Sequence, residues 1–219
     1  MRLIGKFSVL TCVLLSLAGM VTAAPACAAG NINPSAYDRG DYATAAKEFE
    51  LRANRGERLA QFNLAMMIFR GEAAGDKDTA LSWLRKAADQ GMAQAQYNLG
   101  LLYENGAGVP RSQPDATAWF RRAAEQGHTD AQVSLATQYM LGRGAPKDLT
   151  QAAIWYERAA ESDDVGAQYI IASFYEHGDG VKQDLARARD WYVAAARQGD
   201  VLAKGKAQEL GQRLAGQGR

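Results

Sequence analysis

Histidine, the residue used most often for proton transfer and metal binding, occurs only twice in the 219 residues, as His128 and His177. Neither has a second metal ligand one helical turn away. Neither belongs to a pattern of serine or cysteine nucleophile and base that is typical of a catalytic triad. We therefore interpret both histidines as solvated side chains close to loops.

The other groups that could carry chemistry are equally sparse. The two cysteines are Cys12 and Cys27, so the chain beyond them has neither a disulfide nor a thiolate metal site. Glu104 and Glu176 are interpreted as ordinary surface charges. The Gly-x-Gly sequences lack the third glycine and the preceding strand of a phosphate-binding loop, and Ser-x-x-Lys does not occur. The sequence predicts no catalytic residue, no metal site and no cofactor.

The charge balance narrows the class of partner. There are 25 basic and 24 acidic residues, which give a formal net charge of +1. Proteins that bind nucleic acid or anionic membrane surfaces usually carry a marked excess of basic residues. We therefore expect neither nucleic acid nor a membrane surface as a partner.

The N-terminal residues differ from the rest of the chain. Arg2 and Lys6 precede an apolar stretch that runs from Phe7 to about Gly19, and small residues follow it. This layout is typical of a secretory signal peptide, whose apolar part is too short to span a bilayer comfortably. We expect residues 1–28 to be a signal peptide and the protein to be exported, either periplasmic or secreted, without a stable membrane span after its removal.

The cleavage site has two candidates. Val21-Thr22-Ala23 and Ala26-Cys27-Ala28 both fit the small-x-small rule, so cleavage after Ala23 and cleavage after Ala28 remain open. The fate of Cys27 depends on that choice. A permanent membrane anchor and a lipidated Cys27 are less favoured alternatives, because Ala24-Pro25-Ala26 lacks the large aliphatic residue of a lipoprotein signal.

A repeat organises the remainder of the chain. Four tryptophans stand 36 residues apart, at Trp83, Trp119, Trp155 and Trp191. An alanine precedes each tryptophan by three residues, and an Ala-Ala pair follows each by four and five residues. A fixed period of this length predicts stacked supersecondary units.

Each unit reads as two helices. The second, which we term helix B, contains the tryptophan, and seven residues earlier an N-cap residue begins it: Asp76, Ser112, Asp148 or Asp184. Ala, Trp and Ala recur at spacings of three and four, which predicts one buried stripe. A residue suited to a left-handed cap ends helix B eight positions after the tryptophan: Gly91, Gly127, Asp163 or Gly199.

The first helix of each unit, helix A, has its own columns. Ala60, Ala95, Ala131 and Ala167 open them, and a Leu or Ile follows four residues later. The next column holds small residues that would let neighbouring helices approach, namely Ala65, Gly100, Ala136 and Ala172. Helix A then ends in Gly106-Ala-Gly108, Gly142-Arg-Gly144 or Gly178-Asp-Gly180.

The repeat phase sets the boundaries of the chain's parts. A short segment, 29–40, includes a helical stub near Ser35 to Arg39, and Asp41 to Gly56 fits one further helix B. Repeats therefore fill residues 41–200. Residues 201–219 break the pattern, are rich in Lys, Gln and Arg, and predict a capping helix and tail. No low-complexity linker interrupts residues 33–215, so we expect this all-α body to be one continuous domain.

These columns resemble the Sel-one-like repeat family, relatives of tetratricopeptide repeats. The unit from Ala95 to Gly127 carries nearly the whole family pattern, including Leu99-Gly100, Trp119-Phe120 and Gln126-Gly127. Departures are local: Gly71-Glu72-Ala73-Ala74 lacks the second loop glycine, and Ser162-Asp163 replaces Gln-Gly, so both turns are expected to be looser. The resemblance implies an exported bacterial member and a right-handed α-solenoid of antiparallel helix-turn-helix repeats.

The resemblance also implies a function. The concave face of such a solenoid binds proteins or peptides, so we expect a non-catalytic, monomeric scaffold or adaptor whose partner is another protein or peptide in the cell envelope. A structural subunit of a permanent envelope complex remains an alternative. Some cysteine-rich relatives have been linked to penicillin binding, but this chain lacks their cysteines, which disfavours a penicillin-binding or hydrolytic enzyme.

The side of helix A opposite helix B is the candidate binding surface. A solvated helix face should be mostly polar, yet this side carries aromatic, Met and Leu residues in successive units. The alternative is that neighbouring helices bury these residues as additional core. The predicted contact residues are Phe62, Met66, Phe69, Arg70, Tyr97, Leu101, Glu104, Asn105, Val133, Met140 and Tyr169.

Overall fold

A computed structural model describes residues 35–217, which form eleven α-helices and no β-strand. The predicted signal peptide, its two cleavage sites and both cysteines lie outside the described residues. The chain divides into two compact units, Met1–Ala45 and Ala46–Arg219. The helices are α2 (Ser35–Asp38), α3 (Tyr42–Asn54), α4 (Arg58–Phe69), α5 (Lys77–Asp89), α6 (Ala93–Asn105), α7 (Gln113–Ala124), α8 (Thr129–Leu141), α9 (Leu149–Glu161), α10 (Val165–His177), α11 (Leu185–Arg197) and α12 (Val201–Gln217).

In the described part of the first unit, the short α2 precedes the start of α3. The amide of Thr44 donates to Asp41 Oδ1 at 3.1 Å, so Asp41 caps α3 as the sequence predicts. Gly40 takes the left-handed conformation, with φ of 75°, between the two helices. The helical stub expected near Ser35 is present as α2.

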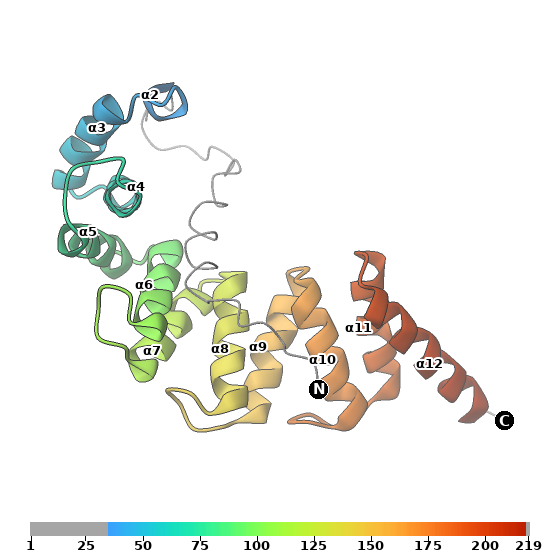
Figure 1. Ribbon diagram of the computed structural model, residues 1–219. Helices are drawn as coiled ribbons and strands as arrows, with labels where there is room; N and C mark the ends of the chain where they lie inside the picture. Colours follow the sequence, from blue (N-terminus) through green and yellow to red (C-terminus); the bar gives the residue numbers. More distant parts are fainter. Residues whose placement is uncertain (1–34, 218–219) are drawn as a thin grey trace, which may run out of the picture. The chain divides into compact units, whose positions relative to one another are not determined.

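Within Ala46–Arg219, helices A and B of the repeat alternate along one row (Figure 1). The A helices are α4, α6, α8 and α10, and the B helices that follow them are α5, α7, α9 and α11. Each of α6, α8 and α10 packs on its own B helix and on the B helix before it. The predicted α-solenoid of antiparallel helical repeats is therefore confirmed.

The B helices begin as the sequence predicts. Asp76 Oδ1 accepts from the amide of Thr79 at 2.8 Å, and Ser112, Asp148 and Asp184 each accept from the amide three residues on. Such caps satisfy amides that have no partner inside the helix. The residues expected in left-handed caps after helix B all have positive φ, including the non-glycine Asp163 at 63°.

The loops after helices α8 and α10 explain their second glycine. A Cβ on Gly144 would overlap the carbonyl oxygen of Gln113, at the start of α7. A Cβ on Gly180 would overlap the carbonyl oxygen of Leu149, at the start of α9, in the same way. These loops therefore fold against the first turn of the preceding B helix, and only glycine fits there.

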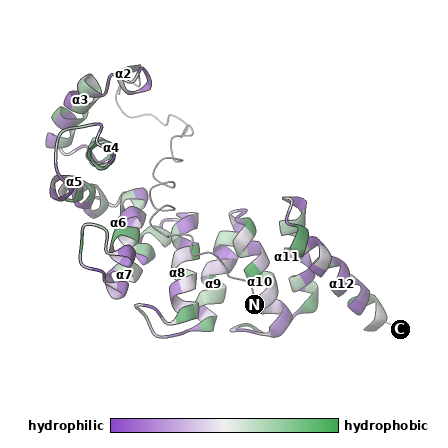
Figure 2. Ribbon diagram, in the orientation of Figure 1, coloured by the Kyte–Doolittle hydropathy of each residue, from purple (hydrophilic) through white to green (hydrophobic). Residues whose placement is uncertain are grey.

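The core consists largely of alanine columns and of large residues from both helices of each unit. The alanine three residues before each tryptophan is fully buried, as are Leu84, Phe120, Tyr156 and Tyr192, which follow the tryptophans. Helices α5 to α11 each carry hydrophobic and hydrophilic residues (Figure 2), in keeping with one buried side per helix.

The prediction that the tryptophans form the buried stripe was wrong in three of four units. Trp155 is buried, but Trp83, Trp119 and Trp191 are only half-buried. The stripe is centred one residue later, and the tryptophans lie at its edge, where cations can reach their rings. The Lys86 ammonium lies 3.9 Å from the Trp83 ring centroid, and Arg122 and Arg158 cover Trp119 and Trp155 similarly.

The small column on helix A lets a B-helix ring reach its backbone. A Cβ on Gly100 would lie 2.5 Å from the Phe120 ring, and Ala65, Ala136 and Ala172 are fully buried. This prediction is confirmed. Phe120 occupies the space that a side chain at position 100 would need, which brings α6 and α7 close together.

The C-terminal helix α12 occupies the place of a further helix A and packs on α11. Ala203 and Leu210 are buried, whereas Val201 and Leu202 are 80% and 72% exposed. The exposed surface at the start of α12 is therefore less polar than we expect for a capping helix. Among the described residues, no helix has the length and apolar character needed to cross a membrane.

Candidate protein-binding face

The eleven predicted contact residues, called the A-helix face below, come from α4, α6, α8 and α10. The structure leaves none of them fully exposed, and only Met66 is buried. The burial of this face is therefore intermediate between that of a free surface and that of an additional part of the core. Ten of its residues are half-buried: Phe62, Phe69, Arg70, Tyr97, Leu101, Glu104, Asn105, Val133, Met140 and Tyr169.

The assignment of Met66 as a contact residue was wrong. Its side chain is only 7% exposed. The Asn98 amide nitrogen, on the next A helix, lies 3.6 Å from its sulfur atom. The neighbouring A helix thus covers this position, an arrangement that the columns of a single unit do not reveal.

Tyr97 is held on one side by its neighbours. Its ring stacks on His128 with centroids 4.7 Å apart, and it lies 5.8 Å from the Phe120 ring at a tilt. Burial, followed by the negative charge of Asp130, raises the pKa of Tyr97 to about 12. Tyr97 is therefore a fixed, neutral ring with part of its surface open to a partner.

The interpretation of His128 as a solvated side chain was wrong. Its Nδ1 accepts from the amide of Ala131 and caps α8, while its Nε2 lies 3.0 Å from Gln94 Oε1. Burial lowers the pKa of His128 below its usual range, which favours the neutral ring that this capping bond requires. His177, in contrast, is exposed as expected and hydrogen-bonds to Ser173.

Glu176 is not a surface charge, which corrects the prediction. It is 6% exposed, accepts from Tyr192 Oη at 2.9 Å, and forms an ion pair with Lys206 Nζ at 3.0 Å. Burial raises the pKa of Glu176, but the hydrogen bonds from Lys206 and Tyr192 outweigh burial and leave the pKa below its usual range. Glu176 therefore attaches α12 to α10.

Glu104 occupies the corresponding place on α6 and is half-buried. Its Oε1 accepts from Gln138 Nε2, on α8, at 2.7 Å. Gln138 is itself 1% exposed, and its own Oε1 is buried without a hydrogen-bond partner among the described residues. Gln138 thus fixes one carboxylate oxygen of Glu104, and the other oxygen of this half-buried side chain can accept from a donor outside the chain.

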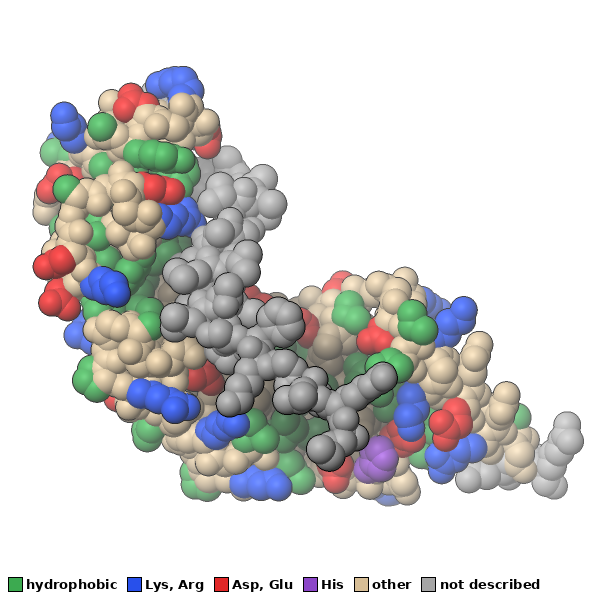
Figure 3. Space-filling view, in the orientation of Figure 1, with side chains coloured by type: hydrophobic (Ala, Val, Ile, Leu, Met, Phe, Trp, Pro, Cys, Tyr) green, Lys and Arg blue, Asp and Glu red, His purple; other side chains and the backbone are tan. Residues whose placement is uncertain are grey.

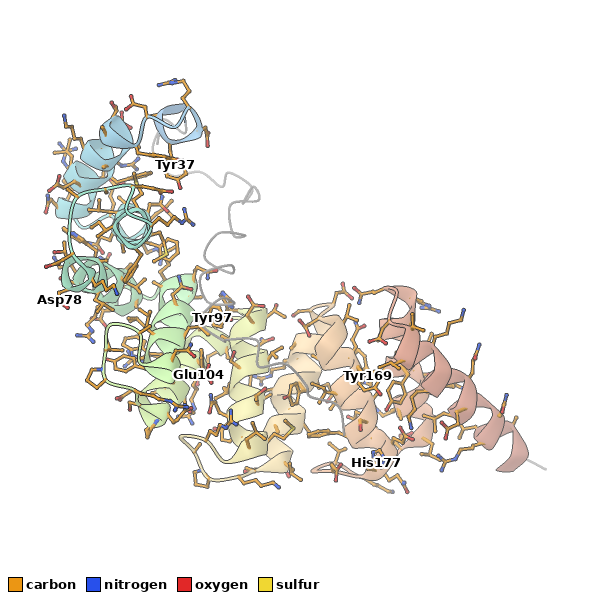
Figure 4. All side chains as sticks on the ribbon, viewed as in Figure 1. Tyr37, Asp78, Tyr97, Glu104, Tyr169 and His177 are labelled. Atoms are coloured by element: carbon orange, nitrogen blue, oxygen red, sulfur yellow. The ribbon has the colours of Figure 1, made fainter. Side chains whose placement is uncertain are left out.

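The remainder of the A-helix face is mixed. Arg70 Nη1 lies 4.0 Å from Glu72 Oε2, and Asn105 Nδ2 donates to the carbonyl of Leu101 at 2.8 Å. Tyr169 packs edge-on against Tyr192, with centroids 5.2 Å apart. The labelled side chains Tyr97 and Glu104 come from α6, and Tyr169 and His177 come from α10 (Figure 4).

A column of glutamines was missed by the sequence reasoning, although its phase is visible in the sequence. Each member donates from Nε2 to the backbone carbonyl eight residues earlier, at the end of the preceding B helix. In three units its Oε1 also accepts from a glutamine in the turn that follows the next helix B: Gln90, Gln126 or Gln198. The column consists of Gln61, Gln96, Gln132 and Gln168.

The described residues contain no group of three or more His, Cys, Asp or Glu that could hold a metal ion. What the A-helix face offers is a row of half-buried aromatic and aliphatic side chains with hydrogen-bonding groups between them. Surfaces of that composition recognise proteins and peptides.

The repeat columns match the family model of the Sel1 repeat in four consecutive segments, 58–92, 93–128, 129–164 and 165–200. The chain belongs to the Sel1 repeat family. The segments begin with each helix A and end with the turn after each helix B, so the A–B pairs described above are Sel1 repeats. Proteins of this family generally act as non-catalytic scaffolds for protein–protein interaction.

Two solved structures resemble this Sel1 repeat protein along most of its length. One is a Sel1 repeat protein from Oxalobacter formigenes, 35% identical, with a TM-score of 0.72, covering 80% of this chain and 70% of that one. The other is c5321, a protective antigen present in uropathogenic Escherichia coli strains, which displays an SLR fold. It is 38% identical, with a TM-score of 0.67, and the match covers 72% of this chain but only 34% of c5321.

A shorter match links one repeat to curated proteins. The DAP3-binding cell death enhancer 1 of Rattus norvegicus is 54% identical over 37 residues, which is 17% of this chain and 7% of that protein. The chain thus spans only about a fifteenth of that relative and about a third of c5321.

Proposed function

We propose that this Sel1 repeat protein is a non-catalytic adaptor of the bacterial cell envelope that binds a partner protein through its A-helix face. The observation that carries the proposal is the row of half-buried aromatic and aliphatic side chains on consecutive A helices. These side chains keep exposed area that the helices of the chain do not cover. Burying such area against a partner is favourable, and aromatic anchors usually dominate the binding energy.

The rings of the face are held in place before binding. Tyr97 is stacked on His128, and Tyr169 is packed on Tyr192. A partner therefore loses little additional side-chain entropy of this protein when it binds, which favours affinity. Phe62 and Phe69, on α4, extend the same face to the preceding unit.

The envelope location rests on the sequence of residues 1–28. Their basic start, apolar stretch and small-residue cleavage sites are those of a secretory signal. That c5321 is a protective antigen agrees with export of a similar protein. Since the repeats themselves hold no cysteine, an oxidising compartment would not alter their fold.

One experiment tests both parts of the proposal. The full chain carries a photoreactive residue in place of Tyr97 and is expressed in its own cells, which are irradiated and fractionated. We expect one dominant adduct in the periplasmic or secreted fraction, with a mature N-terminus at Ala24 or Ala29. The matched control places the photoreactive residue at Ile154, which lies on α9, a B helix, and is 40% exposed. This variant should give no such adduct.

Substitution separates binding from folding. Phe62→Ser together with Phe69→Ser should remove the adduct while thermal unfolding shifts by only a few degrees, because both rings are half-buried. Loss of the cooperative unfolding transition would show that these rings are core, which contradicts the proposal. Aggregation of the isolated wild-type chain would instead favour a permanent subunit over an adaptor.

A further inference from the structure

The A-helix face contains the same pair of residues twice. Tyr97 and Glu104 on α6 stand at the repeat positions of Tyr169 and Glu176 on α10. Figure 4 shows each tyrosine on its helix, with Glu104 farther along α6 than Tyr97. Because the backbones of the two units are equivalent, differences between the two carboxylates arise from the side chains around them.

At Glu176, the chain supplies its own cation. Lys206 stands 30 residues after Glu176, on α12, and its Nζ lies 3.0 Å from Glu176 Oε1. Tyr192 donates to Glu176 Oε2 at 2.9 Å. Each oxygen of the buried carboxylate therefore has a donor, as a buried charge requires.

At Glu104, both of those donors are missing. The position 30 residues later is Ser134, which hydrogen-bonds to Tyr97, and the position of Tyr192 is taken by Phe120, which has no hydroxyl group. Glu104 forms no ion pair with any described residue, and Gln138 Nε2 is the donor it has, on Oε1. One carboxylate oxygen of Glu104 thus stays available.

Gln138 gives an independent sign of a missing donor. It stands where the neighbouring units have Leu102 and Phe174, so a polar side chain has replaced an apolar one at a buried position. Its Nε2 is fixed on Glu104, and its Oε1, buried beside that bond, has no partner among the described residues. A buried acceptor without a donor costs about 1–3 kcal/mol. A polar side chain buried at this cost is explained by its bond to Glu104, which fixes one carboxylate oxygen and leaves the other to accept from a bound group.

We propose that Glu104, held in place by Gln138, binds a lysine or arginine side chain of the partner protein, as Glu176 binds Lys206 within the chain. This inference rests on the proposed function and names the chemistry of the partner. A basic side chain supplies positive charge and an N–H donor to the carboxylate oxygen of Glu104 that Gln138 does not bind. Its aliphatic stem lies against the half-buried Tyr97 and Leu101.

The surface charge supports recognition of one residue rather than of a basic region. Acidic and basic side chains are interspersed over the side of Ala46–Arg219 shown in Figure 3, without a broad area of one sign. The net charge of +1 agrees with this distribution. Specificity for a cation therefore has to come from the Glu104 site itself.

The test uses a displayed library of short random peptides, selected against the purified protein. We expect enriched peptides to share one Lys or Arg among aromatic and aliphatic residues. Glu104→Gln keeps the bond from Gln138 but removes the charge, so those peptides should bind about tenfold more weakly or worse. Ser134→Lys supplies an internal cation by the geometry of Lys206 and should reduce binding similarly, while raising thermal stability.

The control is Glu161→Gln, which removes an exposed carboxylate at the end of α9 and should leave binding unchanged. Peptides that bind equally well to Glu104→Gln, or that lack a shared basic residue, would overturn this inference and leave the proposed function standing. If no peptide is enriched and the photoreactive variant at Tyr97 gives no adduct, the proposed function and this inference are both wrong. Thermal unfolding of every variant confirms that it is folded.

Discussion

The turn between α7 and α8 and the turn between α9 and α10 occupy the same place in successive units, but they differ in the two residues that follow the conserved position of Glu125 and Glu161. The first has Gln126 and Gly127, and the second has Ser162 and Asp163. In the first turn, Gln126 Nε2 donates to Gln96 Oε1 at 2.6 Å. In the second, Gln132 Oε1 is buried and has no partner among the described residues.

The difference teaches that a departure from the repeat pattern in a turn has its consequence in the other helix of the same unit. Ser162 is too short to reach Gln132, which stands 30 residues earlier, so the defect falls on the preceding helix A. The backbone itself is unchanged, because Asp163 keeps the left-handed conformation of Gly127 at φ of 63°. The second turn is therefore strained and incompletely bonded, and its backbone path is conserved.

The largest effect is expected from breaking the complete turn. Gln96→Met keeps the side-chain volume but removes the bond from Gln96 Nε2 to the Ala88 carbonyl at 3.0 Å, and it takes away the acceptor of Gln126 Nε2 in the turn. We expect a loss of about 2 kcal/mol in the free energy of unfolding, measured by urea denaturation. Gln132→Met should cost about 1 kcal/mol or less, because its bond to Ala124 is longer at 3.4 Å and an orphaned oxygen is removed. Equal losses would show that the partner in the turn contributes nothing.

A smaller gain is expected from completing the second turn. Ser162→Gln places an amide where Gln126 and Gln198 stand in the other units, within reach of Gln132 Oε1. We expect about 1 kcal/mol of added stability, the usual net value of a hydrogen bond to a buried acceptor. In the double variant with Gln132→Met the gain should vanish, and a gain that persists would point to helix propensity instead.

The smallest effect concerns the backbone alone. Asp163→Gly removes the Cβ from a residue in the left-handed conformation and so removes its backbone strain. We expect the free energy of unfolding to rise by roughly 0.5–1 kcal/mol. The mirror variant, Gly127→Asp, should lose a similar amount, since a Cβ at this position would meet no atom within 4 Å and sterics add no further cost. Calorimetric melting of the two variants side by side compares the shifts directly.

The parts of the fold that depend on one unit could be predicted from the sequence. The N-caps at Asp76 and Asp148, and the small residue at Gly100, follow from local rules that hold within a helix or a turn. The pattern predicted the loop glycines for the same reason. It could not separate Trp119 from Phe120 as the buried residue, because both lie near the edge of one apolar stripe and the columns alone do not locate its centre.

The parts that depend on contacts between units could not be predicted. Met66 is covered by the next A helix, and Glu176 is paired with α12, so their burial is set by residues about one repeat away. His128 caps α8 and contacts Gln94, which lies on α6, the preceding A helix. The glutamine column could have been found, since its spacing nearly equals that of the tryptophans, but its role becomes clear only when its partner in the turn is considered.

The bonds between glutamines within a unit also bear on how such chains fold and grow. Each bond from a turn glutamine joins residues only 29 or 30 positions apart, wherever in the chain it lies. Closing these contacts therefore costs the same loop entropy at every junction, and a longer array would contain no longer loops. Duplication of one 36-residue segment would extend the protein without slowing the search for its native contacts, since the mean sequence separation of contacts would remain constant.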